Sequence, residues 1–105
     1  MIPFEDFKKL EIKVGKILEV EDHPNADKLY LIKVDTGEKR RLVAGIKNYY
    51  KKEELIGKKI IVICNLEQRE IRGIKSEGML LAAQDENTVS LLTVDKNVKE
   101  GSKIS

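Results

Sequence analysis

The chain has 105 residues, of which 41% are hydrophobic and 36% are charged, and its formal net charge is only +2; this size and balance predict one domain, residues 1–105, with a modest core. No apolar run approaches the roughly 20 residues of a membrane span, and the acidic N-terminus is unlike a signal peptide, so no membrane partner is expected. The single cysteine, Cys64, excludes an intrachain disulfide and fits a reducing compartment, so we expect a cytoplasmic protein.

The N-terminal part of the chain reads as one helical turn, at residues 3–10, followed by a long strand at residues 10–20. An alternation of apolar and charged residues, typical of a half-buried strand, predicts the strand. The apolar residues that share one parity are Leu10, Ile12, Val14, Leu18 and Val20. Gly15 interrupts the pattern, and we expect a bulge or a sharp bend there.

Turn-forming residues at 22–27 separate this strand from two further strands, expected at 28–35 and 40–46. A hairpin connection at 35–39 joins these two strands. Between them and the second half of the chain, Lys52–Leu55 suits a short helix.

The second half of the chain is dominated by strands. Residues 59–66 are continuously apolar and rich in β-branched residues, so they predict the most buried strand. Two more strands are expected at 78–83 and 88–94, with a turn at 85–87 between them. This order predicts an all-β oligonucleotide/oligosaccharide-binding (OB) fold, a five-stranded Greek-key barrel with a short helix between strands 3 and 4 and a C-terminal β extension. The pattern alone leaves other small barrels and a sandwich open.

Residues for catalysis or metal binding do not assemble in this sequence. Cys64 lies inside an apolar run, so we interpret it as a small buried hydrophobe rather than a nucleophile. The only histidine, His23, precedes a proline in a turn, and with Asp22 and Asp27 alone it would make a poor transition-metal site. We therefore expect a binding protein rather than an enzyme, with no catalytic residue, no metal and no cofactor.

Positive charge is concentrated in one stretch. Residues 39–59 hold eight Lys or Arg against two acidic residues, whereas residues 1–38 hold six against nine. A local cationic stretch in a nearly neutral chain indicates binding to a polyanion. An ordinary solvated, lysine-rich face is the alternative, and charge alone favours it.

Three long stretches together resemble a known family: DFKKLEIKVGKILEVEDHPNADKLYLIKVD (6–35), VAGIKNYYKKEELIGKKIIVICNLE (43–67) and IRGIKSEGMLLAA (71–83). They are similar to the tRNA-binding domain found at the C-terminus of methionyl-tRNA synthetases, in free-standing tRNA-binding proteins and in endothelial monocyte-activating polypeptide II. The resemblance implies an OB barrel whose C-terminal extension helps to form a homodimer. It also implies structure-specific tRNA binding with little sequence preference, in cis or in trans to a methionyl-tRNA synthetase, as an appended domain or a separate subunit.

The resemblance also implies a site, because the family positions that match Asn65, Ser76 and Met79 are associated with tRNA binding. On an unbroken strand Ser76 and Met79 would point to opposite faces. They can serve one site only if Gly78 marks a bulge or Ser76 still belongs to the preceding loop. The segment also departs from the family, with acidic or amide residues where Lys, Pro or Gln is common, which implies a less cationic site. These residues are Glu67, Gln68, Glu70 and Glu77.

The residues themselves indicate further contacts with RNA. Arg69, Arg72 and Lys75 follow the fourth predicted strand, where an OB loop flanks the binding face, and can meet phosphates. Cations on the second and third strands can join them where their side chains point to the binding face of the sheet. The full expected RNA-binding set is Lys33, Arg40, Arg41, Asn65, Arg69, Arg72, Lys75, Ser76 and Met79.

Stacking of bases on aromatic rings is a weaker expectation. Three tyrosines could offer surfaces, namely Tyr30, Tyr49 and Tyr50, but the chain has only two Phe and no Trp. Recognition by shape and backbone charge therefore fits better than extended stacking.

Two other functions remain open. Relatives with this barrel resemble secretion chaperones, for which an apolar peptide groove matters more than cations. The domain could instead serve chiefly to dimerise a larger enzyme through edge pairing of residues 88–94 or the tail.

Overall fold

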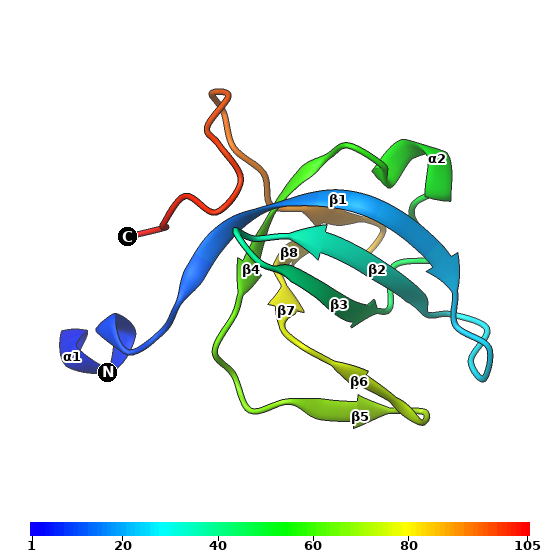
Figure 1. Ribbon diagram of the computed structural model, residues 1–105, viewed down its shortest axis with the longest axis horizontal. Helices are drawn as coiled ribbons and strands as arrows, with labels where there is room; N and C mark the ends of the chain where they lie inside the picture. Colours follow the sequence, from blue (N-terminus) through cyan, green and yellow to red (C-terminus); the bar gives the residue numbers. More distant parts are fainter.

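A five-stranded antiparallel sheet curls into a nearly closed barrel at the centre of the computed structural model, which describes residues 1–105 (Figure 1). The strand order is β3-β2-β1-β4-β7. The bounds are β1 (Ile12–Asp22), β2 (Tyr30–Asp35), β3 (Lys39–Ala44), β4 (Lys59–Ile63) and β7 (Met79–Leu80), with α1 (Phe4–Lys8) before the barrel and α2 (Lys52–Leu55) between β3 and β4. The predicted all-β barrel with its short helix is confirmed. Neither helix is long and apolar enough to cross a membrane.

Two small hairpins lie outside the barrel sheet. The first consists of β5 (Arg69–Ile71) and β6 (Ile74–Ser76), and it projects from the barrel in the segment that we expected to be a loop (Figure 1). The second consists of β8 (Ala82–Gln84) and β9 (Val89–Leu91), so the strand expected at 88–94 is shorter than predicted.

The C-terminal tail returns to the start of the barrel. The Ile104 N–H donates to the Ile12 carbonyl at 2.9 Å, and the Val14 N–H donates to the Ser102 carbonyl at 2.9 Å. Together with the β8-β9 hairpin, this tail forms the predicted C-terminal β extension.

Strand β4 is buried on both faces, as its apolar sequence predicted. Ile60 and Val62 belong to the main core inside the barrel. Ile61 and Ile63 belong to a second cluster on the outside, which residues of the C-terminal segment cover. The residues that pack against this second cluster are Leu10, Leu81, Val94 and Ile104. The extension therefore completes a second small core.

Strand β1 does not keep the single parity that its sequence suggested. Ile17 is buried in the main core, whereas Leu18 is only half-buried. The register of β1 with β2 shifts between Ile17 and Glu19, so the bulge lies after Ile17 and the expectation of a bulge at Gly15 was wrong. Ile12 and Val14 face the outer cluster, and Ile17, of opposite parity, faces the main core. The bulge after Ile17 then brings Val20 to the same face as Ile17.

Gly15 has a different role, which is to permit close packing. It pairs with Ile60 on β4, and a Cβ atom at this position would lie 2.6 Å from Val34 Cγ2. No side chain fits there without displacing the core.

Gly15→Ala should lower the free energy of unfolding by about 1–3 kcal/mol, because the added methyl group overpacks the core beside Val34. Gly45→Ala is the matched control, since a Cβ there would meet only Leu29 Cδ2 at 3.6 Å. Urea unfolding of both variants measures the difference, and equal losses would contradict the packing role of Gly15.

Candidate nucleic-acid interface

The outer face of β1, β2 and β3 carries a hollow of mixed charge. Lys33 on β2 pairs in register with Arg41 on β3 and with Glu19 on β1. The hollow has a volume of about 410 Å³ and is lined by Glu19, Glu21, Leu31, Lys33, Lys39, Arg40, Arg41 and Glu77. Glu19 and Glu21 thus occupy the β1 side and cations the β2 and β3 side, where Glu77 also lies beside Arg41. An anionic ligand would be favoured beside β2 rather than beside β1.

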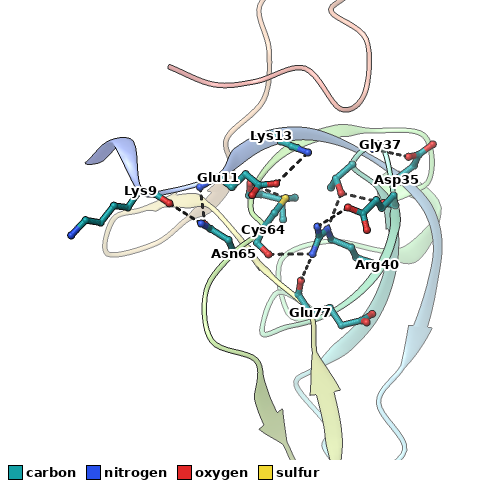
Figure 2. A network of polar contacts seen from close by, with 12 residues as sticks. Lys9, Glu11, Lys13, Asp35, Gly37, Arg40, Cys64, Asn65 and Glu77 are labelled. Atoms are coloured by element: carbon teal, nitrogen blue, oxygen red, sulfur yellow. Dashed lines mark hydrogen bonds and ion pairs between the residues drawn. The ribbon is translucent and has the colours of Figure 1, made fainter. Parts of the chain in front are cut away.

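Arg40 is turned mainly toward the protein itself. Its Nε donates to Thr36 Oγ1 at 2.9 Å, and its Nη1 donates to the carbonyls of Cys64 at 3.1 Å and Glu77 at 3.2 Å (Figure 2). Only 16% of the side chain is exposed. Arg40 therefore ties β3 to the end of β4 and to the residues before β7, and little of its charge is free for a ligand.

The cationic stretch at residues 39–59 does not form one free patch, because four of its eight cations are engaged internally: Arg40, Lys47, Lys52 and Lys59. Lys47 and Lys52 each lie 3.0 Å from the Asp22 carboxylate. Hydrogen bonds from Lys52 first, and then from Lys47, hold the pKa of the Asp22 carboxyl below its ordinary value. The hydrogen bond to Asp22 likewise raises the pKa of Lys52.

The seam between β3 and the residues before β7 is closed partly by side chains. The Val43 N–H donates to Ser76 Oγ at 3.0 Å, and this hydroxyl donates to the Gly78 carbonyl at 3.0 Å. The Arg41 N–H donates to Glu77 Oε1 and the Glu77 N–H donates to the Arg41 carbonyl, both at 2.8 Å. Ser76 is only 6% exposed, so its hydroxyl serves the seam.

A second hollow opens beside this seam, with a volume of about 350 Å³. Met79 is 46% exposed at its edge. The lining residues are Val43, Leu66, Glu67, Arg69, Ile71, Ser76, Gly78 and Met79. Ser76 ends β6 and Met79 begins β7, so the chain leaves one strand and enters another between them, and both residues line one hollow. This differs from both expected routes, a bulge at Gly78 and a loop position for Ser76. The hollow joins an apolar floor to one guanidinium, from Arg69, and one carboxylate, from Glu67.

The β5-β6 hairpin carries the predicted cations Arg69, Arg72 and Lys75. Its turn is formed by Arg72 at φ 52° and Gly73 at φ 88°, the left-handed pair of a tight hairpin turn. Across the hairpin, Lys75 pairs in register with Glu70. A two-residue turn with glycine between REI and IKS was the sequence signal for this hairpin, and our sequence interpretation missed it.

Asn65 links two segments at the mouth of the barrel. Its Nδ2 donates to the Lys9 carbonyl and its Oδ1 accepts from the Glu11 N–H, both at 2.7 Å (Figure 2). One donor hydrogen and one acceptor lone pair of the amide remain available on this exposed residue. Asn65 therefore has a structural task that its sequence position did not indicate.

The tyrosines do not form a stacking platform. The buried Tyr30 hydroxyl donates to the Tyr50 carbonyl at 2.7 Å, and the Tyr50 hydroxyl accepts from the Leu91 N–H at 3.1 Å. Tyr49 alone is exposed, at 48%. The idea that Tyr30 and Tyr50 offer stacking surfaces was wrong, because both rings are committed to the core and its rim.

Ser76→Ala should lower the free energy of unfolding by about 1–3 kcal/mol, because it leaves the Val43 N–H and the Gly78 carbonyl without a partner. Ser90→Ala, on the exposed part of β9, is the control and should change stability by less than about 0.5 kcal/mol. Guanidinium unfolding measures both, and an unchanged midpoint for Ser76→Ala would show that the seam does not depend on this hydroxyl.

Comparison with known proteins gives one family and several relatives. A family described as "Putative tRNA binding domain" matches residues 12–103. A methionine–tRNA ligase of Pyrococcus horikoshii is 60% identical over 104 residues, which are 98% of this chain and 14% of the ligase. The chain thus spans about one seventh of the length of the curated relatives that it matches.

Two solved structures share the fold over the whole chain. The crystal structure of a MetRS-related protein from Pyrococcus horikoshii has a TM-score of 0.92 and 34% identity, covering 100% of this chain and 98% of the other. The CsaA chaperone protein from Picrophilus torridus also has a TM-score of 0.92, with 40% identity and full coverage of both chains.

Proposed function

The chain belongs to the family of tRNA-binding domains, and from this premise we propose that it binds tRNA. Residues 1–105 act in this proposal as one binding unit, either as part of a methionyl-tRNA synthetase or as a separate subunit beside it. The long match to a methionine–tRNA ligase supports this assignment. The unit supplies binding rather than chemistry, and it works in the cytoplasm as a homodimer.

The observation that carries the proposal is the hollow at Met79 between the barrel and the cationic β5-β6 hairpin. An exposed thioether offers a soft surface against which an unstacked base can rest. Arg69 lines the same hollow and can bind a phosphate with two parallel hydrogen bonds. Such a pairing of an apolar floor with a nearby guanidinium suits a folded RNA that exposes a bent backbone and few free bases.

The nine candidate residues divide into two groups in this proposal. Five of them contact RNA through charge, namely Lys33, Arg41, Arg69, Arg72 and Lys75, and Met79 contacts it through packing. The other three, Arg40, Asn65 and Ser76, act mainly by holding the strands and loops that present those contacts, because most of their polar atoms already have partners within the protein.

The double variant Arg69→Ala/Arg72→Ala should weaken tRNA binding by about tenfold or more at low salt, because two charge-assisted contacts are lost. The slope of log K against log salt should also become shallower by about one unit per lost phosphate contact. Filter binding or fluorescence anisotropy across a salt series gives both values.

Lys96→Ala/Lys99→Ala is the matched control, with the same change of charge on the tail at the opposite end of the molecule from the hairpin (Figure 1). It should bind nearly as the parent does. Met79→Ala should weaken binding without changing the salt slope, since it removes packing and no charge. If both the arginine variant and Met79→Ala bind tRNA with the affinity of the parent, the hairpin and its hollow are not part of the tRNA-binding site.

A second candidate function, capture of unfolded peptides, is favoured by the likeness to the CsaA chaperone protein and by the exposed Leu66 and Met79. Apolar capture should persist or strengthen at high salt, whereas RNA binding should fade. We expect tRNA binding that is lost by about 0.5 M salt and little peptide binding at either salt concentration. Salt-resistant peptide binding with weak tRNA binding would reverse this preference.

A further inference from the structure

The loop between β1 and β2 holds the tip of the β5-β6 hairpin through two side chains. His23 Nε2 lies 3.0 Å from the Ile71 carbonyl, and Asn25 Nδ2 donates to the Arg72 carbonyl at 3.1 Å. The loop and the hairpin tip lie side by side in Figure 1. We propose that His23 is a positioning residue for RNA binding, whose neutral imidazole keeps the hairpin docked against the barrel. This inference rests on the proposed function.

The contacts of the imidazole define its protonation state. The Asn25 N–H donates to His23 Nδ1 at 3.0 Å, so Nδ1 must carry a free lone pair. The proton of the neutral ring therefore sits on Nε2, which donates to the Ile71 carbonyl. An imidazolium keeps the bond to Ile71 but turns an N–H toward the Asn25 N–H. Protonation thus opposes the loop conformation that brings Asn25 to Arg72.

β6 packs against β3, and the second attachment adds support at the hairpin tip. β5 and β6 pair only with each other, and a two-stranded hairpin alone is marginally stable in water. Its base is held to β3 through Ser76. Its tip includes Arg72 in the left-handed region at φ 52°, which is unfavourable for a residue with a side chain. Bonds to the successive carbonyls of Ile71 and Arg72 brace that turn.

His23 is 4% exposed, so it acts through the hairpin and does not touch a ligand. The charged side chains on the loop that carries His23 are Asp22, Asp27 and Lys28, and those on the hairpin beside its bond to Ile71 are Glu70, Arg72 and Lys75. Asp22 is engaged with Lys47 and Lys52. The remaining charges include both signs, so the hydrogen-bond geometry at Nδ1 decides the direction of the effect.

The direction of the pH effect separates positioning from direct contact. A histidine that touched a phosphate would strengthen RNA binding when it gained a proton, because it would add a positive charge. The docking role predicts the opposite, since protonation releases the hairpin that carries Arg69 and Arg72. If the docked population falls to about a tenth, the apparent affinity falls about tenfold.

The experiment measures tRNA affinity of the parent, His23→Ala, His23→Gln and Asn25→Ala at pH 7.5 and pH 5.5 at constant salt. Parent binding should weaken severalfold at the lower pH, and His23→Ala should be weak at both. His23→Gln keeps an N–H donor toward Ile71 and does not titrate, so it should bind better than His23→Ala and show a flat pH profile. Asn25 is exposed, and Asn25→Ala removes only its bond to the Arg72 carbonyl. This variant should weaken binding less than His23→Ala.

A readout that needs no RNA separates failure of the inference from failure of the proposed function. Imidazole nitrogen chemical shifts of the parent should show the Nε2–H form at pH 7.5. Amide hydrogen exchange over residues 69–76 should be faster in His23→Ala and in the parent at pH 5.5, after correction for intrinsic rates. If these hold but the parent does not bind tRNA, the proposed function fails and the docking role stands. Unchanged exchange in His23→Ala, or parent binding that tightens on acidification relative to His23→Gln, would overturn the inference.

Discussion

The seam between β3 and residues 76–78 is the contact on which the rest of the structure depends. A curved sheet whose first and last strands remain apart would leave the edge of β3 unpaired and the core open on one side. Here a serine hydroxyl and a glutamate carboxylate take the positions that strand carbonyls hold elsewhere, and the bond from the Glu77 N–H to the Arg41 carbonyl completes the closure. Gly78 lets the backbone approach Ile63 on β4, where a Cβ would lie 3.0 Å from the carbonyl oxygen.

Closure of the seam also creates the site. Because the chain turns at Gly78, the end of the hairpin and the start of β7 lie on one hollow, with Met79 at its edge and Arg69 beside it. The same turn sends the hairpin away from the barrel toward the loop that contains His23. The barrel, the hollow and the projecting cations are therefore consequences of a single local arrangement, and a change in the seam would move all three.

Some cations of this protein are bonded within the fold, and others are exposed and free to meet a ligand. Arg40, Lys47, Lys52 and Lys59 are bound to carbonyls, carboxylates or an amide within the molecule. The exposed Lys33 and Arg41 lie on the outer sheet face, and the arginines of the hairpin lie beyond it. A chain with a net charge of only +2 can thus present a local cationic rim, formed by Lys33 and Arg41 on the sheet face and by Arg69 and Arg72 on the hairpin. Such a rim suits an extended polyanion better than a compact ion.

The order of the barrel strands, the doubly buried β4 and the short helix after β3 followed from periodicity and turn residues, because these depend on neighbours along the chain. The location of the cations between the fourth and fifth barrel strands was also readable from the sequence. The partners of Arg40, Asn65 and Ser76 were not, because each bonds to backbone groups more than twenty residues away that only the closed barrel brings near. The same holds for the face of β1: the bulge after Ile17 changes which parity faces the main core, and a linear alternation carries no record of that register shift.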